Sequence, residues 1–188
     1  TPPSRISRAL PVPPALQSDP AQFAVPSAPV SQGGIAGFNG GEPDYVGSNN
    51  VLVWDAFNWE FAPFDEGPFI RDLFRQQDCP TYSVDYVLNE DATVASVSTF
   101  TNYDTIALIT HGAEGNNGLV SFCTGERRTA EKIELYNVQL MTGELGMMGS
   151  YFSVSPRFID RLAGQFENAI VYNGSCESIR NNTLQNSF

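Results

Sequence analysis

Short apolar runs separated by polar segments fill the chain from residue 51 onward. Four of them are rich in β-branched and aromatic residues, namely VLVWDAF (51–57), TYSVDYVL (81–88), TIALITHG (105–112) and NAIVYNG (168–174). Nearly continuous apolar runs of this length are typical of strands in a parallel sheet, because both faces of such a sheet are buried. We therefore predict four mainly parallel strands.

The segments between these runs favour helices. Residues 67–74 carry apolar side chains on one helical face, and Pro68 suits a first helical position. Residues 92–101 fit both helical and strand periods, but consecutive parallel strands need a crossover, so we expect a helix there. Residues 155–166 predict another helix, and residues 177–188 a last one. The predicted fold class is α/β, a mostly parallel open sheet flanked by helices.

Two stretches at the ends of this pattern are less regular. Between residues 113 and 150, LVSFCT and KIELYNVQL indicate short strands, and GELGMMGS indicates a loop. Residues 1–44 are rich in proline, serine and glycine and lack periodicity, which is typical of a linker or pro-segment that cannot bury enough apolar surface to fold. The predicted organisation is a leader, 1–44, followed by one domain, 45–188.

The charge balance narrows the classes of partner. The 188 residues include 10 Lys+Arg and 21 Asp+Glu, giving a net charge of -11, and such a field repels nucleic acid and anionic membrane surfaces. No apolar run approaches the roughly 18 residues that span a bilayer. The chain begins at Thr1, so removal of an upstream segment stays open. A Pro-rich leader and a single lysine suit an exported bacterial protein, although the location is not fixed.

Three widely spaced cysteines, Cys79, Cys123 and Cys176, are present with a single histidine. This set lacks the CxxC and histidine spacing of a zinc site. A disulfide between Cys79 and Cys123 is left open. No cofactor is expected; calcium bound to the acidic loops is an alternative that no motif supports.

His111 and Cys176 each follow an apolar run and each adjoins a small residue. Catalytic groups of open parallel sheets gather beyond the carboxyl ends of the strands, so neighbouring strands would bring these two side chains together across 65 positions of sequence. An imidazole can hold a cysteine as the reactive thiolate. Gly112 has no side chain, and its N–H, with that of Cys176, is suited to stabilising an oxyanion.

The blocks YDTIALITHG and NAIVYNGSCES resemble those of the caspase-like (clan CD) cysteine peptidases, and the Cys-Glu-Ser ending most resembles the bacterial CHAT and gingipain-type members. The resemblance implies a cysteine endopeptidase with His111 and Cys176 as its dyad and Gly112 as an oxyanion donor. It also implies strand order 2-1-3-4, and further strands after the nucleophile that a second chain or C-terminal segment would supply. Gly-Ser-Cys in place of Gln-Ala-Cys argues against a true caspase.

Substrate preference rests on one residue. Asp55 ends the first predicted strand, where members of this family often place a residue that lines the substrate pocket, and a carboxylate there would favour Arg or Lys. The competing interpretation is that Asp55 caps a turn. The expected partner is a protein or peptide substrate, with self-processing of a longer precursor. The alternatives are a caspase-fold binding or assembly module without turnover, and an unrelated α/β protein.

Overall fold

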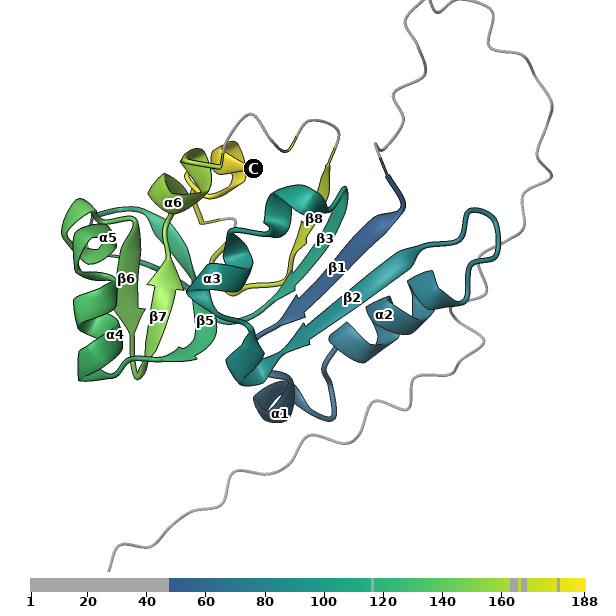
Figure 1. Ribbon diagram of the computed structural model, residues 1–188, viewed down its shortest axis with the longest axis horizontal. Coiled ribbons are helices and arrows are strands. Elements are labelled where there is room, and N and C mark those ends of the chain that lie inside the picture. The colour runs from purple at the N-terminus through teal and green to yellow at the C-terminus, as the bar shows by residue number, and fades with distance from the viewer. Residues whose placement is uncertain (1–47, 116, 163–165, 167–168, 179) are drawn as a thin grey trace, which may run out of the picture. The chain divides into compact units, whose positions relative to one another are not determined.

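A parallel four-stranded sheet forms the centre of the computed structural model, which describes residues 48–115, 117–162, 166, 169–178 and 180–188 (Figure 1). The expected leader, 1–44, lies outside the described residues. The strands, in spatial order, are β2 (Ser83–Leu88), β1 (Asn50–Asp55), β3 (Thr105–Ile109) and β8 (Ile170–Asn173). All four predicted strands are confirmed, and so is the 2-1-3-4 order, with β8 as the fourth strand.

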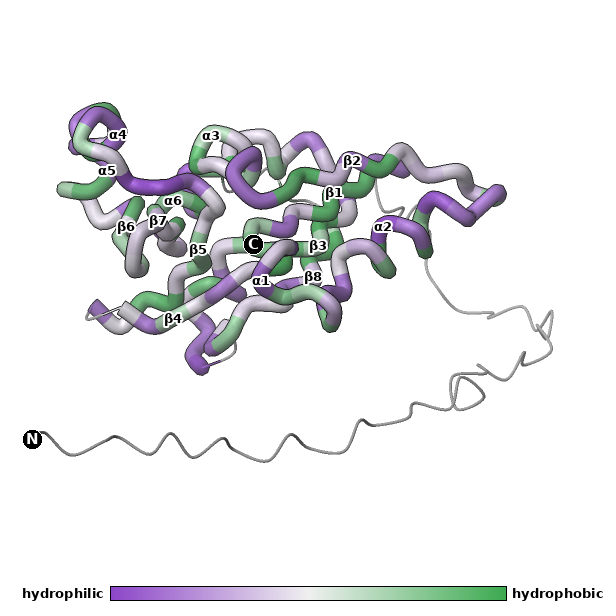
Figure 2. The backbone as a smooth tube through the Cα atoms, turned by 90° about the horizontal axis from the view of Figure 1, so that it is seen from below, coloured by the Kyte–Doolittle hydropathy of each residue, from purple (hydrophilic) through white to green (hydrophobic). Residues whose placement is uncertain are grey.

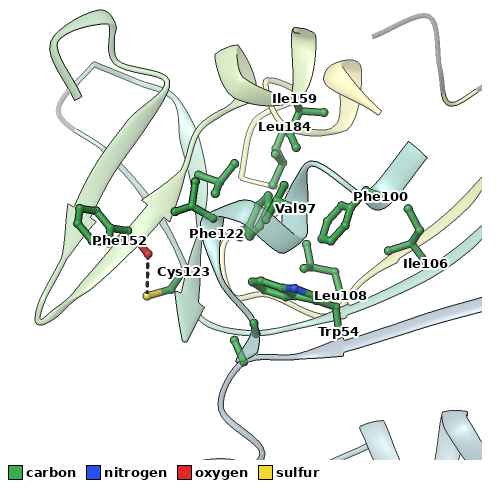
Figure 3. Close-up of a cluster of buried hydrophobic side chains, with 14 of the residues drawn as sticks. Trp54, Val97, Phe100, Ile106, Leu108, Phe122, Cys123, Phe152, Ile159 and Leu184 are labelled. Carbon is green, nitrogen blue, oxygen red and sulfur yellow. Dashed lines mark hydrogen bonds between the residues drawn. The ribbon is translucent and has the colours of Figure 1, made fainter. Parts of the chain in front are cut away.

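Apolar cores lie on both faces of this sheet at β1 and β3, which explains why these strands are nearly continuous apolar runs (Figure 2). Val51 and Val53 lie on one face and pack beneath helix α2 (Gly67–Arg75). Leu52 and Trp54 point to the other face, where Trp54 makes edge-to-face contact with Phe122 at 5.8 Å between ring centroids (Figure 3). This second core joins the parallel sheet to the remaining elements.

An antiparallel sheet lies across that core. Its strands, in spatial order, are β4 (Gly112–Glu114), β5 (Val120–Arg127), β7 (Tyr151–Val154) and β6 (Leu145–Met148). The prediction of a loop at GELGMMGS is wrong, because residues 145–148 pair with β7. The strand predicted at KIELYNVQL is also wrong: the segment forms helices α4 (Ala130–Leu135) and α5 (Asn137–Thr142). Thr129 accepts a hydrogen bond from the Lys132 N–H as an N-cap, and Gly143 ends α5 with φ 72°.

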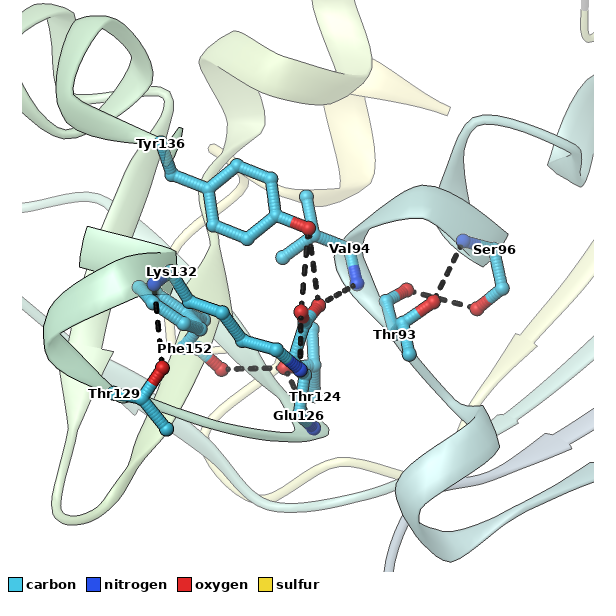
Figure 4. Close-up of polar contacts among 9 residues, drawn as sticks. All are labelled: Thr93, Val94, Ser96, Thr124, Glu126, Thr129, Lys132, Tyr136 and Phe152. Atoms are coloured by element: carbon cyan, nitrogen blue, oxygen red, sulfur yellow. Dashed lines mark hydrogen bonds and ion pairs between the residues drawn. The ribbon is translucent and has the colours of Figure 1, made fainter. Parts of the chain in front are cut away.

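A buried carboxylate on β5 connects three of these elements (Figure 4). Glu126 is only 4% exposed, and it accepts hydrogen bonds from the Val94 N–H at 2.9 Å and from the Tyr136 hydroxyl. Lys132 Nζ lies 2.9 Å from the same carboxylate. The charge is therefore paired and hydrogen-bonded, as burial requires, and it fixes helix α3 (Val94–Val97) and α4 against β5.

Two of the other predicted helices are shorter than the sequence indicates. The helix predicted from residue 67 is confirmed as α2, although Phe69 and Leu73 on its outer flank are exposed. The crossover before β3 contains α3, and the helix from Pro156 is α6 (Pro156–Asp160). The remaining short elements are α1 (Asn58–Phe61) and the 3₁₀ turns Asn89–Asp91, Phe100–Asn102 and Gln185–Ser187.

Within 177, 178 and 180–188 no α-helix forms, so the prediction of a helix directly after Cys176 is wrong for the described residues. Polar side chains there bond locally to the backbone instead, as Asn181 does to the Thr183 N–H. Among the helices of the described part of the chain, none is long and apolar enough to cross a bilayer.

Candidate active site

His111 and Cys176 lie at the same edge of the parallel sheet, where β3 and β8 end. The two strands pair with a constant offset of 65 residues, from Thr105 opposite Ile170 to Leu108 opposite Asn173. The same offset relates residue 111 to residue 176. After Asn173 the chain turns, with the Asn173 carboxamide accepting the Ser175 N–H at 3.0 Å. The turn carries Cys176 over the end of β3, and its side chain is exposed.

Gly112 is in direct contact with this turn. A Cβ atom placed on Gly112 would lie 2.3 Å from the carbonyl oxygen of Cys176 and 2.9 Å from Ser175 Oγ. No side chain fits in that space, so glycine is required for the two segments to approach. The structure thus brings three of the predicted site residues, His111, Gly112 and Cys176, to one place.

The hydrogen-bond pattern of β4 determines where the Gly112 N–H points. Cys123 N–H donates to the His111 carbonyl at 2.8 Å, which makes residue 111 the bonded position opposite β5. Bonded and non-bonded positions alternate along an antiparallel pair, so the N–H groups of Gly112 and Glu114 point away from β5. The contacts of Glu114 are consistent with this direction, because its N–H donates to the Glu177 carboxylate at 3.0 Å. The Gly112 N–H lies two residues earlier on the same edge, beside Cys176.

The residue after the cysteine has an unusual backbone conformation. Glu177 has φ 59°, in the left-handed region that non-glycine residues seldom occupy. Its carboxylate is held by the Glu114 N–H and by Arg180 Nη1 at 2.9 Å, and these contacts lower the pKa of Glu177. Arg180 also pairs with Glu114 at 2.8 Å. The network holds the turn that carries Cys176 against β4.

Two aromatic rings and a carboxylate surround the His111 imidazole. The rings of Phe57 and Phe61 have centroids 4.7 and 4.9 Å from it. Glu60 Oε1 lies 3.2 Å from His111 Nε2, which leaves Nδ1 as the nitrogen not engaged by the carboxylate. Within the described residues no hydrogen bond joins the imidazole to the Cys176 thiol, and in unliganded sites such bonds are often long. The sequence pattern did not assign Glu60 this position, because no periodicity links α1 to β3.

Asp55 ends β1 but is buried rather than presented at the surface. It is fully shielded from solvent, and Tyr86 donates a hydrogen bond to its Oδ2 at 2.9 Å. Its Oδ1 has no partner of its own among the described groups. Burial, together with hydrogen bonding to Asp65, raises the pKa of Asp55 to about 7. Its role in lining a substrate pocket stays a prediction, and a basic side chain would reach it only by displacing what covers it.

Burial of this carboxyl makes stability depend on pH. In the unfolded chain Asp55 ionises near pH 3.8, whereas in the folded chain it holds its proton to about pH 7. The folded state therefore binds more protons between these values, and the free energy of unfolding falls as the pH rises from about 4 to about 7. We expect Asp55→Asn, which keeps the shape without the charge, to flatten this decline.

Urea unfolding at a series of pH values between 4.5 and 8 measures the effect. The Asp55→Asn protein should gain stability relative to the wild type as the pH rises. Asp78→Asn, at an exposed position, is the matched control and should follow the wild-type curve. Parallel curves for wild type and Asp55→Asn would show that Asp55 is ionised in both states.

The other two cysteines lie away from the turn. Cys123 is buried in β5, where burial and the nearby Glu60 raise the pKa of its thiol to about 12. Cys79 is exposed after α2, and both are free, so the disulfide left open by the sequence does not form. No cluster of three or more His, Cys, Asp or Glu side chains suited to a metal ion occurs among the described side chains.

Comparison of the chain with protein-family models, with curated proteins and with solved structures gave no significant match in any of the three. The arguments about function therefore rest on the residues and their geometry.

Proposed function

We propose that this chain is a cysteine endopeptidase of the caspase-like kind, with Cys176 as nucleophile and His111 as general acid and base. The observation that carries the proposal is the contact between the Cys176 backbone and Gly112. It joins an exposed thiol, a histidine and an outward-pointing N–H at the carboxyl edge of a parallel sheet. These are the three groups that acyl transfer requires.

In the first half of the proposed reaction, His111 takes the proton from the Cys176 thiol. The sulfur attacks the scissile carbonyl carbon and forms a tetrahedral oxyanion, which accepts hydrogen bonds from the Gly112 and Cys176 N–H groups. The intermediate collapses as the carbon–nitrogen bond breaks, and His111 returns its proton to the leaving amine. Glu60, a positioning residue at 3.2 Å from Nε2, orients the ring.

In the second half, water replaces the departed amine. His111 removes a proton from the water, whose oxygen attacks the thioester carbonyl carbon. The second tetrahedral intermediate expels the cysteine sulfur, which recovers the proton from His111. A carboxylic acid leaves and the enzyme returns to its starting state, so no redox partner is required.

A partner that completes the parallel sheet belongs to this proposal. β8 is an edge strand within the described residues, and its side chains Ile170 and Tyr172 are 55% and 50% exposed. An edge with apolar side chains invites pairing with another strand. A C-terminal segment or a second chain that adds strands beside β8 would cover both residues.

The same edge supports the second candidate function, a caspase-fold module that assembles with partners without turnover. Such a module needs the β8 edge but has no use for an activated thiol. The state of Cys176 therefore separates the two candidates.

Competitive alkylation with iodoacetamide, read by peptide mass spectrometry, tests the proposal. Cys79 and Cys176 are both exposed, so a difference between them reports chemical activation rather than access. We expect Cys176 to alkylate at least about tenfold faster than Cys79, because the imidazole can accept the thiol proton as the sulfur reacts, and Cys123 to stay unlabelled. His111→Asn should bring Cys176 to the rate of Cys79. Equal rates in the wild type would favour the assembly module.

A further inference from the structure

A pocket of about 380 Å³ lies on the antiparallel sheet and begins two residues beyond His111. Its lining starts at Ala113 on β4 and continues across β5, β7 and β6. Alternate residues of a strand are roughly 7 Å apart. In an extended peptide whose scissile bond lies at Cys176, a side chain one or two residues from that bond would therefore reach the pocket.

The pocket and the imidazole share one face of the sheet. Side chains alternate between the two faces of a strand, so His111 and Ala113 point the same way. Ser121 lies directly opposite Ala113, and Ser153 is opposite Cys123, the residue bonded to His111. Gly146 is opposite Ser153. These four pocket residues form a floor on the catalytic face, while the side chains between them enter the core.

The floor is made of small residues, and one of them holds a hydroxyl with no protein partner. Ser153 is only 4% exposed, and its hydroxyl makes no hydrogen bond to the described residues. Gly146 leaves room for it, since a Cβ there would lie 2.8 Å from Ser153 Oγ. Ser155 differs, because it donates to the Gly143 carbonyl at 2.7 Å. A nearly buried hydroxyl in the lining of the pocket is a group for a ligand to satisfy.

The walls of the pocket disfavour a charged ligand group. Met147 and Met148 of β6 both line the pocket, and their side chains are flexible and polarizable. Glu114 is the one charged side chain among the described lining residues, and it is already paired with Arg180 at 2.8 Å. An acidic ligand group would meet Glu114 and the net charge of -11, and a basic group would have to displace Arg180.

We propose that this pocket is a specificity subsite that binds a long uncharged substrate side chain, glutamine best, within two residues of the scissile bond. The methionines contact the methylene groups, and the Ser121 and Ser153 hydroxyls bind the carboxamide, which both donates and accepts. The inference rests on the proposed peptidase function. It is independent of a preference for Arg or Lys through Asp55, which ends β1 and does not line this pocket.

Two variants and a matched control test the subsite with acetylated hexapeptides in which each position in turn is Gln, Met, Arg or Asp. Ser121→Leu fills the floor and should lower kcat/KM for the best Gln peptides by about tenfold or more. Ser153→Ala keeps the volume and should lower the ratio of Gln to Met cleavage by about fivefold, the effect of one lost hydrogen bond. Ser150→Leu, on the exposed turn between β6 and β7, should change neither.

A binding measurement keeps the subsite testable apart from catalysis. Methyl NMR of the Cys176→Ala protein should show Met147 and Met148 shifting with the Gln peptide, while Met141, 81% exposed on α5, stays fixed. Shifts that vanish in Ser121→Leu support the subsite even if the wild-type protein cleaves no peptide. That absence of cleavage would overturn the peptidase proposal alone. Cleavage with the same Gln, Met, Arg and Asp preferences in all variants overturns the subsite alone. If the protein shows neither cleavage nor these shifts, the peptidase proposal and the subsite proposal are both overturned.

Discussion

Cys176→Ala should abolish peptide cleavage while leaving the fold unchanged. The substitution removes the sulfur that forms the thioester, and alanine has no nucleophile to replace it, so kcat should fall by about 10⁴-fold or more. The thiol is exposed, and exposed positions of this kind change stability by less than about 0.5 kcal/mol. Cleavage of a hexapeptide library by liquid chromatography and mass spectrometry gives the first result, and urea unfolding gives the second.

Cys79→Ala is the matched control, since it removes another exposed thiol from the same molecule. It should retain wild-type activity. If Cys176→Ala cleaves as fast as the wild type, the nucleophile assignment is wrong. If Cys79→Ala loses activity instead, the reactive thiol is the other one.

Gly112→Ala should have the second-largest effect, on activity and stability together. The new methyl carbon would lie 2.3 Å from the Cys176 carbonyl oxygen, a backbone atom that no rotamer change can move away. Relieving the contact requires the 175–177 turn to separate from β4. We expect a loss of about 1–3 kcal/mol in unfolding free energy and at least about 100-fold in kcat/KM, because the Gly112 N–H leaves the oxyanion position.

Gly149→Ala distinguishes this steric effect from a general intolerance to alanine. Gly149 lies in the β6–β7 turn, and a Cβ there meets no atom within 4 Å. Its φ of 58° still makes alanine unfavourable, so a modest loss of stability is expected with activity unchanged. Equal activity of wild type and Gly112→Ala would mean that the turn is not held as described and that the oxyanion donor lies elsewhere.

The parallel sheet was predictable from sequence because burial on both faces leaves an unambiguous apolar run in each strand. The positions of His111 and Cys176 followed from those runs, since the carboxyl ends of neighbouring parallel strands meet at one edge. Their separation of 65 residues is the same as the β3–β8 register offset. The helices α4 and α5 were missed for a physical reason: Leu135, Val138 and Met141 are apolar yet exposed, and they obscure the helical face formed by Tyr136 and Leu140.

Other parts of the site left no readable pattern. The contact of Glu60 with His111 depends on how α1 folds back over the end of β1, and no local propensity fixes that path. The left-handed backbone at Glu177 is imposed by contacts with Glu114 and Arg180. Sequence periodicity carries no information on either. The environment of Asp55 was predictable only in part. The alternation of β1 places it on the α2 face with Val51 and Val53, but only the structure shows that it is fully buried.

Two residues, Thr110 and His111, link the two sheets at the candidate active site. β3 ends at Ile109, and the His111 carbonyl already accepts the Cys123 N–H of β5, so His111 and Gly112 lie with the antiparallel sheet, whereas Cys176 follows β8 of the parallel sheet. Any rotation of the antiparallel sheet against the parallel one must therefore move the base and the oxyanion donor together relative to the nucleophile. A ligand or partner that contacts both sheets at this junction would therefore fix how the catalytic groups are aligned.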